Sequence, residues 1–408
     1  MLTAALPTAT WEMTNTPSAH SPSARSVHVL KPHGEDERRA LLYLLQDYAR
    51  RLEPNNKRIQ SCGRRVAPHR QGVAIKVENG RAAYHGVMRC GSLYSCPTCA
   101  ARITEQRRIE LTSAFDTHPE YRPYLLTLTM RHKYGESLKR GIDDIQGAWE
   151  FMKSGRAWQA FKTRWYIVGT IRALEVTHGR NGWHPHFHIL LVSEGEWERH
   201  ELDQMQAELE KLWLNALKHH GRNGQDGVAA KVTNSEGVKA YIAKYGTEES
   251  WNAVSELTKS GVKHGRTDGQ RTPFQILAST PHSHRDRKLW HEYHTTMKGR
   301  RQLIWSRGLR ELLGVGKERP DEELAQEEPT EAPPMAVLSR TEWRVVVKAR
   351  WRSLLLDAAE AGQAVLDTYL AYVRSQVVKV DLQTGQIYYP SPFMGELPPN
   401  VRIARHRS

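Results

Sequence analysis

The segment Trp183-His-Pro-His-Phe-His-Ile-Leu-Leu-Val192 decides the fold, because it joins an apolar strand pattern to a row of histidines. Successive side chains of a β-strand point to opposite faces, so residues i and i+2 share a face. His186 and His188 therefore point the same way, whereas Phe187 and Ile189 point into the core. Two imidazoles on one face of a rigid strand form a preorganised platform for a metal ion.

The residues before this strand supply a third candidate ligand. A β-rich stretch is followed by the turn signal Gly179-Arg-Asn-Gly182, which predicts a hairpin. A turn centred on Arg180-Asn181 would place Glu175 opposite His186, and a turn centred on Asn181-Gly182 would place it opposite His188. Both registers bring the Glu175 carboxylate to the histidine face.

Two histidines and one carboxylate leave open coordination positions, as a catalytic cation requires. The mixed nitrogen and oxygen donors of His186, His188 and Glu175 suit Mg²⁺ or Mn²⁺, and Zn²⁺ is an alternative. We assign His184, beyond Pro185, a supporting role at most. The competing interpretation is a pair of core or surface histidines that bind no metal, and the opposed glutamate argues against it.

A pair of tyrosines follows downstream, in the segment Val238-Lys-Ala-Tyr-Ile-Ala-Lys-Tyr245. Tyr241 and Tyr245 are spaced i, i+4, so on a helix both hydroxyls leave one face, and Lys244 lies beside the second. A tyrosine phenol can attack a phosphodiester and form a covalent phosphotyrosine, while a lysine stabilises charge on the phosphate. Two aromatic residues at this spacing are also common in a helix core, so the motif gains weight only from the histidine strand and the basic charge.

All the cysteines of the chain, Cys62, Cys90, Cys96 and Cys99, lie in one short window. The Cys96-Pro-Thr-Cys99 pair has the spacing of a zinc knuckle, and Cys90 and Cys62 can complete a tetrahedral site. His85 or His69 could take the place of Cys62, whose spacing from the other cysteines is long. We predict structural Zn²⁺ here rather than free buried thiols.

Basic residues surround the cysteines, which fits contact with nucleic-acid phosphates. We predict DNA contacts at Arg89, Arg102, Arg107 and Arg108, and the same neighbourhood contains Arg64, Arg65 and Arg70.

The charge of the whole chain favours a polyanionic partner, most often nucleic acid. The 408 residues include 59 Lys and Arg against 45 Asp and Glu, a formal net charge of +14. An anionic membrane is the rival partner, but the sequence lacks a strongly basic amphipathic helix that ends in a lipid anchor. It also lacks a run of about 18 apolar residues that could span a bilayer. The N-terminus lacks the basic start and apolar core of a signal peptide, so we expect a cytoplasmic protein with no membrane contact.

The pattern along the chain predicts an α+β protein with five regions. Residues 1–36 are rich in Ser, Thr and Pro and are expected to be disordered. Residues 37–115 combine a helix with the cysteine-rich zinc-binding region, and residues 116–310 alternate strands with helices around the histidine hairpin. Residues 311–336 form an acidic, proline-rich linker, and residues 337–408 are mostly helical.

Three segments resemble, in order, the motifs of the rolling-circle replication initiators of small plasmids and phages, a family of the His-hydrophobe-His (HUH) endonucleases. Tyr124-Leu-Leu-Thr-Leu-Thr129 is similar to the first family motif, and His184-Pro-His-Phe-His188 to the metal-binding second motif. Tyr241-Ile-Ala-Lys-Tyr245 is similar to the nucleophile motif in its two-tyrosine version. The cysteine cluster is similar to one in the plasmid branch, and the resemblance extends over roughly residues 60–300.

This resemblance implies a central antiparallel sheet with helices on one face and the active site on the other. It implies a nick at the plasmid origin, in single-stranded or cruciform DNA, that leaves a 5′-phosphotyrosine and a free 3′-OH. Tyr245 would be the first nucleophile and Tyr241 its alternate, which would act in termination. The implied setting is the bacterial cytoplasm, and the implied partners are the host helicase and DNA polymerase. The resemblance leaves the oligomeric state open.

We weigh four other functions against this interpretation. A two-tyrosine single-strand transposase shares the chemistry, whereas a conjugative relaxase would carry its tyrosine ahead of the histidines. A non-catalytic, zinc-dependent DNA-binding protein would explain the charge and the cysteines but leave His186, His188 and Tyr245 without a role. A metal hydrolase of small molecules would use the histidines but not the basic charge.

Overall fold

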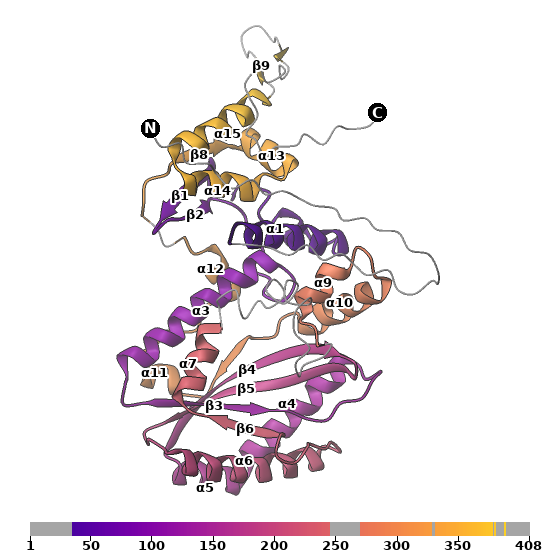
Figure 1. The fold of residues 1–408 in the computed structure, drawn as a ribbon, viewed down its shortest axis with the longest axis vertical. Coiled ribbons are helices and arrows are strands. Elements are labelled where there is room, and N and C mark those ends of the chain that lie inside the picture. Colours follow the sequence, from indigo (N-terminus) through magenta and orange to yellow (C-terminus); the bar gives the residue numbers. More distant parts are fainter. Residues whose placement is uncertain (1–34, 245–269, 329–330, 378, 381–386, 389–408) are drawn as a thin grey trace, which may run out of the picture.

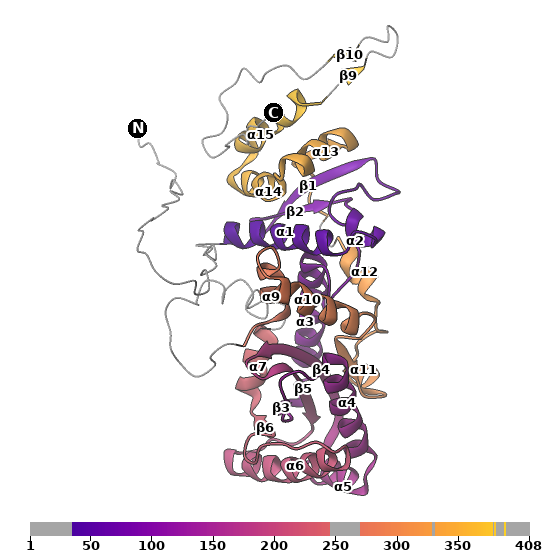
Figure 2. The same cartoon turned by 90° about the vertical axis from the view of Figure 1, so that its right-hand side faces the viewer.

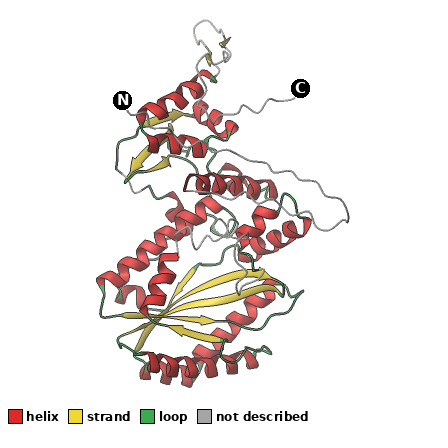
Figure 3. Cartoon of the chain, viewed as in Figure 1, coloured by secondary structure: helices red, strands yellow, loops and turns green. Residues whose placement is uncertain are grey.

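The computed structural model describes residues 35–244, 270–328, 331–377, 379–380 and 387–388. Over these residues the chain is α+β, with antiparallel sheets and flanking helices, which confirms the predicted fold class (Figures 1 and 3). The molecule is elongated, with a five-stranded sheet toward one end and a small three-stranded sheet toward the other (Figure 2).

The five-stranded sheet has the strand order β6-β3-β5-β4-β7, and every neighbouring pair is antiparallel. Its strands are β3 (Arg122–Leu128), β4 (Ile167–Gly179), β5 (Gly182–Ser193), β6 (Ala230–Thr233) and β7 (Leu303–Trp305).

The predicted histidine hairpin is β4 and β5, and it forms the centre of this sheet. Gly179 pairs with Gly182 across the turn, so Glu175 faces His186, the first of the two predicted registers. Gly182 has φ +88°, a left-handed conformation that glycine adopts without steric cost.

Three helices cover one face of the sheet: α4 (Leu138–Ser154), α5 (Arg156–Arg164) and α6 (Arg199–His219). Their apolar stripes pack on the odd-numbered side chains of β5, including Phe187 and Ile189. The sequence pattern predicts one helix over Ile142–Phe161, but the structure has two. The chain is extended at Gly155 (φ −77°, ψ 150°), which ends α4 and starts α5.

The opposite face of the sheet is covered over only part of its area. Helices α3 (Pro97–Thr117), α7 (Ser235–Lys244) and α11 (Leu309–Leu312) pack with the chain around them on Leu190 and Val192. The histidine end of β5 lies beyond this apolar contact. The arrangement leaves one end of a rigid sheet face available for polar side chains, as the family resemblance implies.

The start and the end of the described chain pack together at the other end of the molecule (Figure 1). A small antiparallel sheet has the order β2-β1-β8 and joins the N-terminal hairpin to a strand from residues 336–339. The elements of this end are α1 (Glu35–Leu52), α2 (Lys57–Ser61), β1 (Gly72–Glu78), β2 (Arg81–His85), β8 (Ala336–Ser339), α13 (Arg340–Ala349), α14 (Arg352–Ala361) and α15 (Gln363–Ser375).

Two further helices, α9 (Pro273–Ser279) and α10 (His284–Met297), pack with α1 and α4 beside the histidine hairpin. The remaining elements are α12 (Asp321–Gln326), β9 (Lys379–Val380) and β10 (Ile387–Tyr388). Among the described helices, none is both long and apolar enough to cross a bilayer. The boundaries of the five predicted regions stay a prediction.

Candidate active site and zinc centre

The structure brings Glu175, His186 and His188 into one group on the open part of the sheet face. Glu175 Oε2 lies 3.5 Å from His186 Nε2 and 3.3 Å from His188 Nε2. Ligand atoms held at about 2.1 Å and at right angles around one cation lie about 3 Å apart. The carboxylate oxygen therefore lies nearly at this spacing from both imidazole nitrogens, and all three ligand atoms lie within 4.8 Å of one another. Their residue types fit Mg²⁺, Mn²⁺ or Zn²⁺.

The hydrogen bonds of the two imidazoles turn the Nε2 atoms toward Glu175. His186 Nδ1 lies 3.3 Å from the carbonyl oxygen of His184, and His188 Nδ1 lies 3.0 Å from Thr127 Oγ1. An Nδ1–H that donates to such an oxygen leaves the Nε2 lone pair free for a metal. Thr127 belongs to the first motif of the sequence, but only the pairing of β3 with β5 shows that it supports His188.

The electrostatics of the group favour an anionic Glu175. Burial opposes ionisation, but His188 and His186 outweigh it and hold the pKa of the Glu175 carboxyl well below its usual range. Burial lowers the pKa of His188, but the facing Glu175 raises it by more. The pKa of His188 is therefore above its usual value. A carboxylate that stays charged beside two imidazoles is a ready ligand for a divalent cation.

Tyr241 is the tyrosine that the described residues place at this group. Its hydroxyl donates to Glu175 Oε1 at 3.3 Å, and its ring centroid lies 4.9 Å from that of His188. Helix α7, which carries it, packs against β3. Tyr245 lies outside the described residues, and of Lys244 the structure describes the helical backbone alone.

A second pair of histidines adjoins the group. The ring of His184 stacks on that of His186 at 5.2 Å, so His184 shares the metal face of β5. Its Nδ1 lies 3.0 Å from Nδ1 of His132, a residue that the sequence pattern did not single out. Burial and the neighbouring His186 and His132 lower the pKa of His184 to about 3, which keeps this imidazole neutral.

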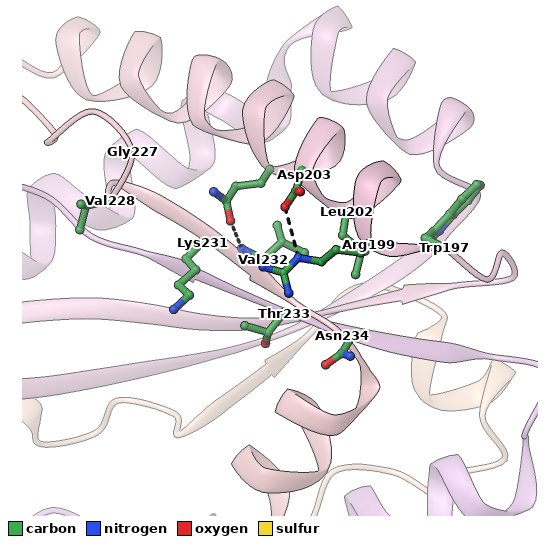
Figure 4. A pocket seen from close by; sticks show the side chains of 11 residues that line it. Trp197, Arg199, Leu202, Asp203, Gly227, Val228, Lys231, Val232, Thr233 and Asn234 are labelled. Atoms are coloured by element: carbon green, nitrogen blue, oxygen red, sulfur yellow. Dashed lines mark hydrogen bonds and ion pairs between the residues drawn. The ribbon is translucent and has the colours of Figure 1, made fainter.

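Lys231 on the edge strand β6 lies in the same cross-strand row of the sheet as Thr127 and His188. It pairs with Thr127, which in turn pairs with His188, so the three side chains leave the same face. Lys231 also lines a pocket of about 630 Å³ between β6 and α6, together with Trp197 and Arg199 (Figure 4). The strand pairing, not the sequence alone, shows that this cation lies on the histidine face of the sheet.

The four cysteines form a second, separate group. Their Sγ atoms lie 3.5–3.7 Å apart in three pairs: Cys62 with Cys96, Cys62 with Cys99, and Cys90 with Cys99. Sulfurs bound to zinc at about 2.3 Å in a tetrahedron lie about 3.8 Å apart, so the spacing fits one Zn²⁺. All are buried and none forms a disulfide.

Polar groups around the cysteines orient the sulfurs. Gln46 Nε2 donates to Cys62 Sγ at 3.4 Å and to Cys96 Sγ at 3.5 Å. Such outer contacts are typical of thiolate metal sites. Neither His85 nor His69 belongs to the group, so Cys62 holds the position that the sequence left open between them.

The arginines predicted to contact DNA make contacts within the protein. Arg102 donates to the carbonyl oxygens of Ala325 and Glu327, and Arg107 pairs with Asp321. Arg108 pairs with Glu105 at 2.7 Å, and Arg89 donates to the carbonyl oxygen of Tyr84 at 2.9 Å. Their contact with DNA stays a prediction.

Two of these arginines hold helix α12, which lies inside the stretch predicted as an acidic linker. Leu324 and Ala325 of α12 are buried beside Cys90 and Cys99. The sequence signal for this helix is an apolar pair after the acidic first turn Asp321-Glu-Glu323, which favours a helix N-terminus. The acidic segment therefore packs over the cysteine group.

The fold and these two groups define an α+β protein with two candidate metal sites, one of four cysteines and one of two histidines and a carboxylate. The family model described as "Replication protein" matches residues 85–352, which is more than half of the chain. The chain therefore belongs to the replication protein family, and this confirms at the level of the family the resemblance to replication initiators. The matched residues include the five-stranded sheet with its histidine strand, helix α7 and three of the cysteines.

Individual relatives agree with this membership. "Protein rep" of Streptomyces lividans is 27% identical over 310 residues, 60% of this chain and 67% of that protein. A "Neomycin resistance protein" of Streptomyces cyanogenus is 28% identical over 153 residues, 31% of this chain and 35% of that protein. "Protein rep" of Streptococcus pneumoniae is 24% identical over 170 residues, 40% of this chain and 49% of that protein. The chain thus spans less than half of the last two, and no solved structure matches it.

Proposed function

We propose that this protein initiates rolling-circle replication of a plasmid by cutting one DNA strand at the origin through a tyrosine. One observation carries the proposal: the Tyr241 hydroxyl lies 3.3 Å from the carboxylate that shares a candidate metal site with His186 and His188. A phenol beside a two-histidine, one-carboxylate group is suited to phosphoryl transfer. Membership of the replication protein family supports DNA as the substrate.

The reaction transfers a phosphodiester from the DNA sugar to a phenol. A bound Mg²⁺ or Mn²⁺ would neutralise charge on the scissile phosphate. The phenol oxygen bonds to phosphorus and gives up its proton, while the bond from phosphorus to the 3′ oxygen breaks. The departing 3′ oxygen gains a proton, so the products are a 5′-phosphotyrosine and a free 3′-OH.

Some residues of the site would bind the cation, and others would react with the DNA or stabilise charge on it. Glu175, His186 and His188 would hold the cation, and Glu175 Oε1 also accepts a hydrogen bond from the Tyr241 hydroxyl and so orients that phenol. Tyr245 would make the first cut, and Tyr241 would act in the second transesterification that ends the cycle. Lys244 and Lys231 would offset charge on the phosphate.

The partners follow from the products of this reaction. The substrate would be origin DNA exposed as a single strand or cruciform, the free 3′-OH would prime the host polymerase, and the host helicase would unwind the strand.

A denaturing gel tests the proposal. The protein is incubated with labelled single-stranded DNA from the plasmid's own origin and Mn²⁺, beside Tyr245→Phe, Tyr241→Phe and His186→Ala. We expect a protein-DNA band that requires Tyr245 and His186, whereas Tyr241→Phe still makes the first cut. Tyr166→Phe, which removes an exposed phenol elsewhere on the protein, is the matched control and should leave the band unchanged.

The competing function gives a different result in the same assay. A zinc-dependent protein that only binds DNA would shift the labelled strand on a native gel and give no covalent band with any variant. That outcome would contradict the catalytic assignment.

A further inference from the structure

A strongly basic groove lies at the end of the molecule away from the histidine site. It has a volume of about 1330 Å³ and is lined by the C-terminal part of α1, the turn after α2, and α13. Figure 2 shows α1, α2 and α13 above the five-stranded sheet, which lies near the lower end of the molecule. Its cationic lining residues are Arg50, Arg51, Arg64, Arg65, Arg340, Arg344, Lys348 and Arg350.

Carboxylates do not neutralise this groove. Asp47 is the one acidic residue of its lining, and it is already paired with Arg50 and Arg352. Among the described residues, no ion pair joins the exposed cations of the groove to a carboxylate. This differs from the arginines around the zinc centre, which are engaged with α12.

Helix α13 presents three of the cations as a stripe. Arg340, Arg344 and Lys348 are spaced i, i+4 and i+8, so they share one face of the helix, and all are exposed. Like charges at this spacing destabilise an isolated helix. A stripe of this kind is stabilised when a polyanion neutralises it, which points to a ligand rather than to a structural role.

Two further arginines of the groove are held in conformations that cost free energy. Arg50 is 7% exposed, and its Nη1 atom is buried without a hydrogen-bond partner among the described residues. Arg350 ends α13 with φ +61°, a left-handed conformation that glycine usually supplies and that costs a larger residue about 1 kcal/mol. Both features are typical of a surface kept for binding.

We propose that this groove binds the phosphate backbone of double-stranded DNA. The three cations of α13 extend over about 12 Å of helix axis, since the rise is about 1.5 Å per residue. Duplex DNA presents one phosphate charge per about 1.7 Å, roughly seven over that length. A second, duplex-binding surface would hold the origin while the strand is cut at the sheet; that division of labour rests on the proposed function, whereas duplex binding itself does not.

Salt-dependent binding to a labelled duplex tests the groove. Each phosphate contact contributes about 0.9 to the slope of log affinity against log salt, so removing three contacts should lower it by about 2.7. The variant R340Q/R344Q/K348Q should show this loss in fluorescence anisotropy with a 30-base-pair duplex of arbitrary sequence. Its melting temperature and zinc content should match wild type, because these side chains are exposed and glutamine favours a helix.

The matched control removes the same charge elsewhere. R156Q/K211Q/K218Q changes exposed cations on α5 and α6, which cover the far face of the large sheet, and should keep the wild-type slope. R64Q/R65Q tests the wall opposite α13 and should lower the slope by about 1.8. This pair also keeps the test valid if the α13 variant does not fold.

Two outcomes would overturn the proposal: groove variants that keep the wild-type slope, or a control that loses as much as they do. Nicking of single-stranded origin DNA is measured in parallel and should be unchanged in the groove variants. If no variant nicks but duplex binding still depends on the groove, the catalytic proposal fails and the groove proposal stands.

Discussion

The two candidate metal centres differ in what surrounds them. The difference indicates a structural role for the cysteine group and a catalytic role for the histidine group. The cysteine sulfurs lie at the ends of helices and in loops, each cysteine is at most 2% exposed, and α12 packs over them. The histidine group lies on the central strands of a sheet, and the Glu175 side chain is 41% exposed. A closed set of four thiolates is typical of structural zinc, whereas three mixed ligands with open positions suit a catalytic cation. The comparison predicts that damage to one centre unfolds the protein and damage to the other stops its chemistry.

The largest effect should follow loss of a zinc ligand. Structural zinc contributes about 10–16 kcal/mol to the folding of small zinc domains, so Cys96→Ser should abolish zinc binding and unfold the region around it. Elemental analysis and circular dichroism measure the two quantities together. Unchanged zinc content and melting temperature in Cys96→Ser would remove the structural role from this centre.

Removal of a ligand from the histidine group should leave the fold intact and stop the reaction. A metal ion supplies several kcal/mol of transition-state stabilisation, so His186→Ala should slow nicking about 10³-fold, at about 1.4 kcal/mol per factor of ten. Rates of single-strand cleavage with Mn²⁺ measure the effect. Zinc content should match wild type, and a variant that loses zinc as well would show that the two centres are not independent.

Truncation of a buried side chain in α12 should lower the free energy of unfolding without removing a ligand from the cysteine group. Leu324 is 4% exposed beside the cysteines, and replacing a buried leucine by alanine usually costs about 2–5 kcal/mol. Urea unfolding of Leu324→Ala should show a loss in this range. Leu312→Ala is the control, because that leucine is 39% exposed, and an equal loss in both variants would mean that α12 adds nothing specific.

The smallest effect should come from the hydrogen bond that orients His188. Thr127→Val removes the hydroxyl 3.0 Å from His188 Nδ1 and keeps the side-chain shape. Loss of such a supporting contact typically lowers metal affinity about 10–100-fold. Mn²⁺ titration measures it, with Thr129→Val as control, since that hydroxyl bonds to the carbonyl oxygen of Val228. Equal affinity in wild type and Thr127→Val would show that Thr127 does not position the ligand.

The parts of this comparison that the sequence predicted are local in the chain. Strand alternation places His186 and His188 on one face, and the short turn at Arg180-Asn181 brings Glu175 opposite His186. The cysteines could be grouped because they lie in one window. Such short-range patterns depend on few conformations, so one sequence is enough to predict them.

The remaining features depend on contacts between distant parts of the chain. Strand β8 pairs with β1 across more than half of the sequence, and Asp321 reaches Arg107 only because α12 folds back on the cysteine group. Charge near the cysteines therefore did not show which arginines are free for DNA. Lys231 likewise joins the histidine row only through the order of strands in the sheet.

The central claim is that the cut DNA strand becomes covalently attached to a tyrosine, either Tyr245 just after α7 or Tyr241 within it. Peptide mapping tests this claim directly. Trypsin cuts after Lys239, Lys244 and Lys259, so it separates Tyr241 from Tyr245 into different peptides. The protein is incubated with origin DNA and Mn²⁺, digested with nuclease and trypsin, and analysed by mass spectrometry. The account predicts a nucleotide on the peptide 245–259 in wild type and none in His186→Ala. A nucleotide on a peptide outside 240–259, or equal labelling of His186→Ala, would contradict it.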